Sequence, residues 1–233
     1  MPEFRLDNQT VTFEQGQSIM QAASNAGIYI PHLCYHKEFS AHGSCRVCLV
    51  KVDGRYLSAC TIPAKQDMVV FNLTDDVQRY RRQLLEMLFV EGNHLCPGCE
   101  KSGGCTLQSV AIFCGMVSPN LDFQYPKRSV DASHPDFILD YNRCINCELC
   151  ARASREVDQK SVFRMSGRGR NSHLVVNTKS GLLGDSTLHI NDRAASICPV
   201  GALLVKHRGF STPIGARKFD INPLPHHKAA KNE

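Results

Sequence analysis

Apolar and polar side chains alternate in short stretches over the first 75 residues, the pattern of strands that bury one face. The predicted strands are residues 4–7, 10–13, 47–52, 56–59 and 68–71. Asn8-Gln9 separates the first pair, and Asp53-Gly54, a dipeptide typical of tight hairpin turns, separates the second. We therefore expect a small sheet built largely from hairpins.

One helix is expected to pack on this sheet. Ser18 and Gln21 have the spacing of a capping box, in which each side chain satisfies a backbone N–H at a helix start. Residues 19–26 then have helical character, and Gly27 is typical of a left-handed stop. A sheet covered by one helix is a stable two-layer arrangement, so the fold class predicted here is α+β.

A longer helix is predicted after Thr74, a residue typical of an N-cap, with Asp75 and Asp76 at its positive end. Its apolar side chains recur at helical spacing, as expected for a face packed in the core. They are Val77, Tyr80, Leu84, Leu85, Leu88 and Phe89. A short helix is expected over 106–113, and a connector with three prolines over 118–135.

The C-terminal third alternates short elements with cysteine-bearing loops. A helix is expected over 148–157, and the predicted strands are residues 137–139, 162–165 and 174–176. Beyond Lys206 the chain is rich in Pro, Lys and His and has no hydrophobic period. We expect residues 209–233 to be a tail that is flexible or that docks on a partner.

Composition changes this picture mainly through cysteine. The chain has 233 residues and twelve cysteines, no export signal at Met1–Thr10, and no apolar run of the ~20 residues that a membrane span needs. We therefore expect a cytoplasmic protein, in which clustered cysteines indicate metal rather than disulfides. The net charge of +5 is scattered and no tryptophan is present, which argues against nucleic-acid binding.

The first cysteine set is Cys34, Cys45, Cys48 and Cys60. Cys45 and Cys48 place two thiolates on one tight loop, and the isolated Cys34 and Cys60 complete four ligands, as a [2Fe–2S] cluster requires. Gly43 suits a loop whose backbone approaches inorganic sulfide closely. A four-cysteine zinc site is the alternative, although such sites usually pair two knuckles.

The last set has the most specific spacing: Cys144, Cys147 and Cys150, followed far along the chain by Cys198-Pro199. Three cysteines at successive i, i+3 positions wrap a cubane more readily than they reach three corners of a zinc tetrahedron. A remote cysteine before a proline completes the pattern of bacterial ferredoxins. No second triplet lies near Cys198, so we expect all four cysteines to bind one [4Fe–4S] cluster.

The middle set contains Cys96, Cys99 and Cys105, and its fourth ligand is either His94 or Cys114. Eleven cysteines and one histidine would make three sets of four, and this count is compatible with His94. In that case Cys114 is a small buried hydrophobic residue.

The chain has no Gly-x-Gly-x-x-Gly motif after a strand, no phosphate-binding loop that ends in Gly-Lys-Ser/Thr, and no evident catalytic triad. We therefore expect no catalytic residue, no NAD-binding site and no FMN-binding site here. The bond-making chemistry is expected in neighbouring subunits.

With these three sets in order, residues 4–205 resemble the N-terminal part of the large iron–sulfur subunit of respiratory complex I. The segments 103–108, Gly-Gly-Cys-Thr-Leu-Gln, and 197–203, Ile-Cys-Pro-Val-Gly-Ala-Leu, look like those of that family. Among chains of this length, the sequence is similar to the small diaphorase subunits (HoxU) of NAD-reducing [NiFe] hydrogenases, which also resemble it over 91–102. One departure is that only Leu95 separates His94 from Cys96, whereas most of the superfamily has three residues there.

The resemblance implies three modules. Residues 1–76 would be a plant-type [2Fe–2S] ferredoxin-like (β-grasp) domain, and 77–118 a [4Fe–4S] module with His94 and three cysteines as ligands. Residues 119–208 would be a ferredoxin-like [4Fe–4S] domain, and 209–233 the tail.

The resemblance also implies a function: electron relay between a hydrogenase and an NAD-linked flavoprotein, with reversible hydrogen oxidation coupled to NAD reduction. The implied partners are the flavoprotein diaphorase subunit and the hydrogenase small and large subunits, which would carry FMN, NAD and the Ni–Fe centre. Neither nucleic acid nor membrane is expected as a partner. The alternatives are the equivalent subunit of an NAD-dependent formate dehydrogenase or of an NADP-reducing hydrogenase, and a zinc-binding structural protein.

Overall fold

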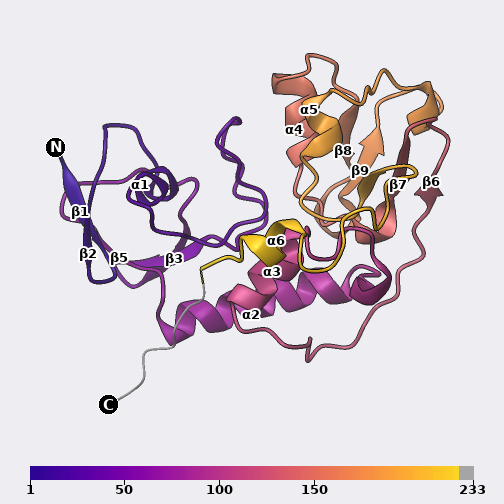
Figure 1. Ribbon diagram of the computed structural model, residues 1–233. Coiled ribbons are helices and arrows are strands. Elements are labelled where there is room, and N and C mark those ends of the chain that lie inside the picture. The colour runs from indigo at the N-terminus through magenta and orange to yellow at the C-terminus, as the bar shows by residue number, and fades with distance from the viewer. Residues whose placement is uncertain (226–233) are drawn as a thin grey trace. The chain divides into compact units, whose positions relative to one another are not determined.

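The computed structural model describes residues 1–225. They form two compact units: residues 1–86 and 110–118 with Pro225 in unit 1, and residues 87–109 and 119–224 in unit 2 (Figure 1). Helices α2 (Asp75–Val90) and α3 (Thr106–Phe113) each begin in one unit and end in the other. Over residues 1–225, no helix has both the length and the apolar character that crossing a bilayer requires.

Unit 1 contains a five-stranded sheet with the order β2-β1-β5-β3-β4. Its elements are β1 (Glu3–Leu6), β2 (Gln9–Thr12), α1 (Ile19–Asn25), β3 (Leu49–Val52), β4 (Arg55–Ser58) and β5 (Val69–Phe71). The β1–β5 pair is parallel and the other pairs are antiparallel. The five predicted strands are confirmed, but the first turn is one residue earlier than predicted, because Leu6 pairs with Gln9 and leaves Asp7 in a left-handed conformation.

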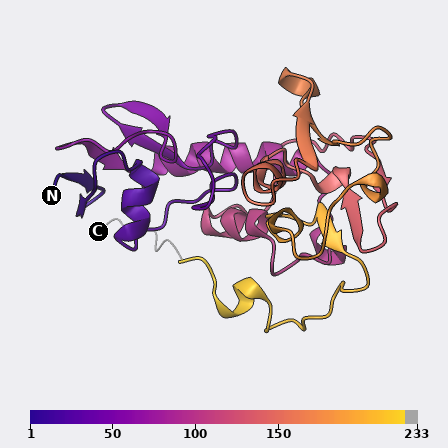
Figure 2. The ribbon, with the colours of Figure 1, turned by 90° about the horizontal axis from the view of Figure 1, so that it is seen from above.

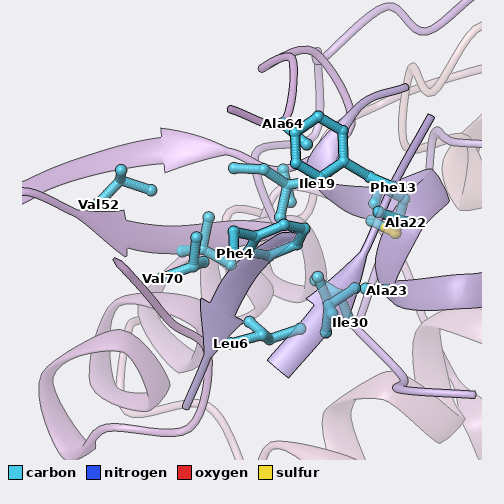
Figure 3. Packing of buried hydrophobic residues seen from close by; sticks show 14 of the residues in the cluster. Phe4, Leu6, Phe13, Ile19, Ala22, Ala23, Ile30, Val52, Ala64 and Val70 are labelled. Atoms are coloured by element: carbon cyan, nitrogen blue, oxygen red, sulfur yellow. The ribbon is translucent and has the colours of Figure 1, made fainter. Parts of the chain in front are cut away.

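Helix α1 covers one face of this sheet, as predicted. Ser18 and Gln21 form both hydrogen bonds of the capping box. The helix places Ile19, Ala22 and Ala23 against strand residues such as Phe4 and Val70, and all of these side chains are at most 1% exposed (Figure 3). This packing is the core of unit 1.

The part of α2 in unit 1 differs from its predicted face. Val77 and Leu85 are buried as expected, whereas Tyr80 is exposed. The most deeply buried large side chain is Arg81, which donates to the backbone oxygens of Leu49 and Asn72 and to the Asn72 side chain. Burying a guanidinium costs little only when its N–H groups find acceptors. Three acceptors from β3 and the segment before α2 satisfy the two terminal nitrogens of Arg81, while its Nε has no hydrogen-bond partner among the described residues.

Unit 2 contains two small sheets, β10-β7-β6 and β8-β9. Its elements are β6 (Val130–Asp131), β7 (Phe137–Asp140), α4 (Leu149–Glu156), β8 (Phe163–Ser166), β9 (His173–Val176), α5 (Arg193–Ser196), β10 (Leu203–Val205) and α6 (Lys218–Ile221). Short 3-10 helices lie at Cys96–Gly98 (η1), Tyr141–Arg143 (η2), Gly169–Asn171 (η3) and Leu183–Asp185 (η4). The predicted elements of this region are confirmed. Strand β6 within the connector, strand β10 and the short helices α5 and α6 were not predicted.

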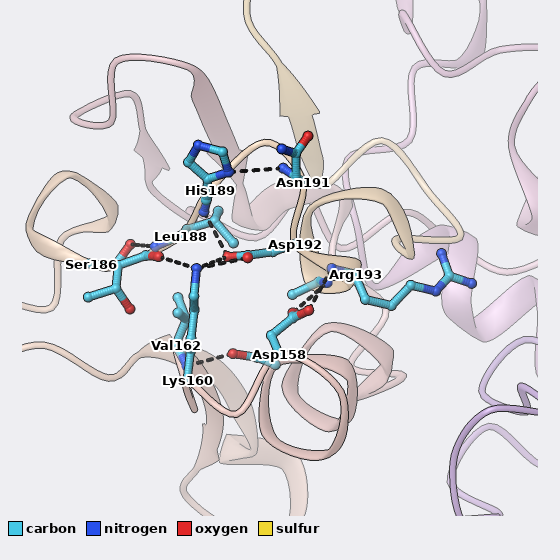
Figure 4. A network of polar contacts seen from close by, with 12 residues as sticks. Asp158, Lys160, Val162, Ser186, Leu188, His189, Asn191, Asp192 and Arg193 are labelled. Atoms are coloured by element: carbon cyan, nitrogen blue, oxygen red, sulfur yellow. Dashed lines mark hydrogen bonds and ion pairs between the residues drawn. The ribbon is translucent and has the colours of Figure 1, made fainter.

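A polar network fixes the start of α5, the helix that leads to Cys198 (Figure 4). The Asp158 carboxylate accepts the backbone N–H groups of Arg193 (2.7 Å) and Ala194 (2.9 Å). Lys160 forms an ion pair with Asp192 at 2.8 Å. Because unsatisfied N–H groups at a helix start favour a negative charge, this carboxylate stabilises the helix from outside its own sequence.

The segment after β10 turns back within unit 2, and α6 lies in it (Figure 2). The Phe219 backbone N–H donates to the Gly103 oxygen at 2.9 Å, so this part of the predicted tail contacts the loop that carries the middle cysteines. Residues 226–233, the rest of that tail, lie outside the described residues.

Candidate iron–sulfur sites

The first ligand set lies in unit 1, where two loops meet beside the β3–β4 hairpin. Cys45 and Cys48 directly precede β3, Cys60 follows β4, and Cys34 comes from the loop after α1. Pairing of β3 with β4 brings Cys48 and Cys60 together, with their sulfur atoms 3.4 Å apart. The Cys45 backbone N–H lies 3.5 Å from the Cys34 sulfur.

The thiols of this set interact strongly. Hydrogen bonds from Cys45 and from Ser44 lower the pKa of Cys34 to about 5, despite its burial. The Cys60 sulfur and burial raise the pKa of Cys48. The four sulfur atoms are thus close enough to compete for protons, as donors of a shared metal centre are.

Gly43 allows the backbone to turn into the loop that carries Cys45. Gly43 has a φ of +72°, a conformation that L residues rarely adopt. A Cβ at Gly43 would lie 2.9 Å from Cγ2 of Thr61, the residue after Cys60. Both the backbone conformation and the space therefore require glycine next to the Ser44-Cys45 turn.

The third set lines a cavity in unit 2. Cys144, Cys147, Cys150 and Cys198 all face it, and the rest of its wall is mostly apolar, including Leu139 and Phe163. Asn146 and Glu148, which lie between the cysteines of the triplet, both have left-handed backbones, with φ of +51° and +62°. These two residues turn the loop around the cavity and lead into α4.

The residues of the third set lie around one cavity, with Cys147 buried and the other three half-buried. Burial raises the pKa of Cys144 to about 11. Burial and then the neighbouring Cys147 and Cys198 raise the pKa of Cys150 well above its usual range. Four thiolates around one largely apolar cavity are electrostatically unfavourable unless cations accompany them, and the irons of a cluster are such cations.

The middle set lines a second cavity of unit 2. His94, Cys96, Cys99 and Cys105 all face it, together with Phe89. Cys96 begins the 3-10 helix η1 and Cys99 is the residue that caps its end, while Cys105 directly precedes α3. The phenyl ring of Phe89 packs against the His94 imidazole at a centroid distance of 5.5 Å and fixes the ring in the wall.

The state of the His94 imidazole suits a metal ligand. Burial, followed by the charges of Arg128 and Arg143, lowers its pKa to about 4, so the ring is neutral at pH 7. Among the described residues its Nε2 is buried without a hydrogen-bond partner. A neutral imidazole has a ring nitrogen with a free lone pair, which is what a metal ligand needs.

Cys114, the alternative fourth ligand, lies in unit 1 and is not among the described residues that line this cavity. It is 3% exposed, and burial raises its pKa to about 11. Its backbone oxygen accepts a hydrogen bond from Arg82 at 3.2 Å. This is the environment of a small buried hydrophobic residue.

The donor sets fit the expected groups, although no three His, Cys, Asp or Glu side chains of the described residues converge on a single metal ion. Each of the two cavities in unit 2 is lined by four donor residues. In the middle cavity one of them is His94, whose buried Nε2 has no hydrogen-bond partner among the described residues. Thiolate and imidazole are the ligands that iron–sulfur clusters use.

Two residues at the middle cavity were missed by the sequence analysis. Arg143 lines the cavity, and its Nη1 lies 3.7 Å from the Cys99 sulfur. Gly201 also lines it, and a Cβ there would lie 3.0 Å from the same sulfur. The position of Arg143 directly before Cys144 was the available signal, but it does not indicate which cavity the side chain enters.

Three family models match successive segments of the chain. A 2Fe-2S iron-sulfur cluster binding domain matches residues 2–74, and the NADH-ubiquinone oxidoreductase-G iron-sulfur binding region matches 81–119. A 4Fe-4S single cluster domain matches residues 137–205. The α+β fold class and the three iron–sulfur modules in this order are therefore confirmed. The exact module boundaries stay predictions.

Relatives cover nearly the whole chain. The NAD-reducing hydrogenase HoxS subunit gamma of Cupriavidus necator is 36% identical over 223 residues, 95% of this chain and 94% of its own length. A chain in the crystal structure of an NAD+-reducing [NiFe]-hydrogenase in the H2-reduced state superposes with a TM-score of 0.92 at 51% identity, covering 95% of this chain and 94% of that chain.

A longer relative shares the same region. The mitochondrial NADH-ubiquinone oxidoreductase 78 kDa subunit of Candida albicans is 32% identical over 212 residues. That match covers 89% of this chain but only 29% of the relative.

Proposed function

Because the chain belongs to the family of iron–sulfur subunits that includes the gamma subunit of NAD-reducing hydrogenase, we propose that it relays electrons between a [NiFe] hydrogenase module and a flavoprotein that carries FMN and the NAD site. The reaction of the whole complex is reversible hydrogen oxidation coupled to NAD reduction. This chain is a non-catalytic electron-transfer subunit of that oxidoreductase.

The arrangement of donors carries this proposal. We assign Cys34, Cys45, Cys48 and Cys60 to a [2Fe–2S] cluster, and Cys144, Cys147, Cys150 and Cys198 to a [4Fe–4S] cluster. His94, Cys96, Cys99 and Cys105 are assigned to a second [4Fe–4S] cluster. When bound, such clusters supply one-electron chemistry. The protein supplies the ligands, the position of each site and the local charge.

The residues at each site determine its local charge and polarity. His94 is a neutral ligand in place of a thiolate, and it removes one negative charge from the middle site, which favours a higher reduction potential. The mostly apolar wall of the third cavity lowers the local dielectric and keeps out water.

The proposed partners follow from the family. They are the diaphorase flavoprotein and the small and large hydrogenase subunits, which hold the FMN, the NAD site and the Ni–Fe centre. We place the complex in the cytoplasm, since none of the twelve cysteines forms a disulfide and eleven of them are assigned as cluster ligands, a use of cysteine that a reducing compartment favours.

Anaerobic purification of the tagged chain from its native cells tests the proposal. Nickel and FMN should co-purify with it, and the complex should reduce NAD with hydrogen, whereas the isolated chain should not react with hydrogen. Molybdenum or tungsten in place of nickel would instead identify a formate dehydrogenase and contradict the hydrogenase assignment.

A further inference from the structure

Arg143 lies between the two ligand sets of unit 2. It is the last residue of η2 and directly precedes Cys144, so its backbone belongs to the third set. Its side chain, however, lines the cavity of the middle set. One residue therefore joins the two sites, by the backbone to one and by the guanidinium to the other.

The guanidinium contacts a middle-set sulfur. Arg143 Nη1 lies 3.7 Å from Cys99 Sγ and 3.4 Å from the Gly201 oxygen. The absence of a side chain at Gly201 makes room for this contact, since a Cβ there would lie 3.4 Å from Nη1 as well as 3.0 Å from the sulfur. A cationic N–H group that donates to a thiolate forms a charge-assisted hydrogen bond.

Two carboxylates keep the guanidinium in this position. The Arg143 Nε pairs with Asp140 at 2.9 Å, and Nη1 pairs with Glu100 at 2.6 Å. Asp140 is itself held by the backbone N–H of Asn142. Because both ion pairs are partly buried, with 16–33% of each side chain exposed, the arginine is positioned before any electron arrives.

We propose that Arg143 is a positioning residue that raises the reduction potential of the middle cluster through its contact with Cys99. The inference rests on the proposed function, since it presupposes a cluster in this cavity. A reduced cluster carries one more negative charge than an oxidised one, so a fixed cation at a ligand sulfur stabilises the reduced state more. The guanidinium would stay protonated in both redox states, so Arg143 itself would take up or release no proton.

The test is a redox titration, followed by EPR, of the purified complex carrying Arg143→Gln, Arg143→Lys or the control Arg155→Gln. Arg155 is an exposed arginine of the same unit, and its guanidinium pairs with Glu156. The middle-cluster signal is identified by its change in a Cys105→Ser variant. The [2Fe–2S] signal of unit 1 serves as the internal reference.

In Arg143→Gln, the ratio of reduced to oxidised middle cluster at a fixed potential should fall roughly tenfold, which is about 59 mV for one electron. Arg143→Lys keeps the charge but loses the planar fork, so it should give a smaller fall in the same direction. The control should change the ratio by less than about twofold.

An unchanged middle-cluster potential in Arg143→Gln would overturn the inference. If Arg143→Gln loses the middle cluster, the test depends on Arg143→Lys. An unshifted potential in Arg143→Lys, or loss of the cluster from both variants, would also overturn the inference. A wild-type complex without reducible iron–sulfur signals would instead contradict the proposed function, so the two failures are distinguishable.

Discussion

At the scale of single residues, buried arginines and close-packed glycines determine how the cysteine loops are held. Arg81 is fully buried in unit 1 and donates to Leu49, the residue after Cys48. Gly43 lies at the entry to the Cys45 loop with a φ of +72°. Neither residue is a ligand, yet both restrict the backbone beside the first set.

Replacing Arg81 with lysine should destabilise unit 1. The planar guanidinium of Arg81 reaches the two Asn72 acceptors, at 2.7 and 2.8 Å, and the Leu49 oxygen at the same time. A lysine ammonium cannot reach all three, so buried polar atoms lose their partners. We expect the free energy of unfolding to fall by about 2–3 kcal/mol, measured by anaerobic chemical denaturation. The control is Arg79→Lys on the exposed side of the same helix, which should change it by less than about 0.5 kcal/mol. Equal effects of both variants would contradict the role of Arg81.

Alanine at Gly43 should weaken the [2Fe–2S] site. Gly27 is a matched control, because its φ of +73° is almost the same but a Cβ there meets nothing within 4 Å. Gly27→Ala should therefore show only the backbone strain, about 1 kcal/mol. Gly43→Ala adds the clash with Thr61 and should also reduce the intensity of the [2Fe–2S] EPR signal per chain. An undiminished signal would show that the loop adapts to the side chain.

The ligand residues were the most predictable part of the site. Cysteine spacing is local, so the loops around Cys45, Cys96 and Cys144 could be recognised from the sequence. The structure brings the four predicted donors of each cavity in unit 2 together, although the assignment of ligands stays a proposal. Arg81 and Arg143 could not be predicted, because their partners lie far away in sequence and a basic residue reads as a surface residue until its acceptors are known.

Among the elements, the strands were predictable because alternating apolar and polar residues place one set of side chains in the core. A one-residue shift in pairing would move every side chain to the opposite face, so the pattern is strongly specified. The start of α2 was less predictable. Asp76 was expected to face the helix N-terminus, and it does accept the Val77 N–H, but it also binds Lys51 at 2.9 Å and the Tyr56 hydroxyl at 2.6 Å. The carboxylate thus ties α2 to the β3–β4 hairpin.

Asp76→Asn should separate this tertiary role from a simple helix-dipole effect. We expect a loss of roughly 0.5–1 kcal/mol at pH 7, larger than for Asp75→Asn in the same turn. The nearby Thr74 hydroxyl and the hydrogen bonds from Tyr56 and Lys51 hold the pKa of Asp76 well below 3.8, so its stabilisation is present above pH 3.8 and lost as the pH falls further. Urea unfolding at a series of pH values from 7 downward measures the loss of stability and its pH dependence. Equal losses for Asp76→Asn and Asp75→Asn would contradict the stabilising contact between Asp76 and the β3–β4 hairpin.

Helix α5 shows why caps are hard to predict. Asp192 occupies the N-cap position, yet its side chain pairs with Lys160 while Asp158 accepts the helix N–H groups. The capping residue lies 35 positions before the helix start. Local sequence rules describe only caps that lie next to the helix.

At the scale of the whole molecule, the chain is a set of metal-binding loops held by two small cores. Unit 1 carries one complete donor set, and unit 2 carries two that are connected by Arg143 and Gly201. The order of the three modules could be predicted from the cysteine sets. The division into compact units could not be predicted. Helices α2 and α3 each have residues in both units, and no feature of the sequence marks where one unit ends within a helix.

Iron and acid-labile sulfide analysis, with EPR of the reduced, anaerobically purified protein, determines whether one chain holds three clusters. We expect about ten iron and ten sulfide per chain, the sum for one diiron and two cubane clusters, and three reducible signals. Zinc without sulfide, in a colourless protein without EPR signals, would contradict it.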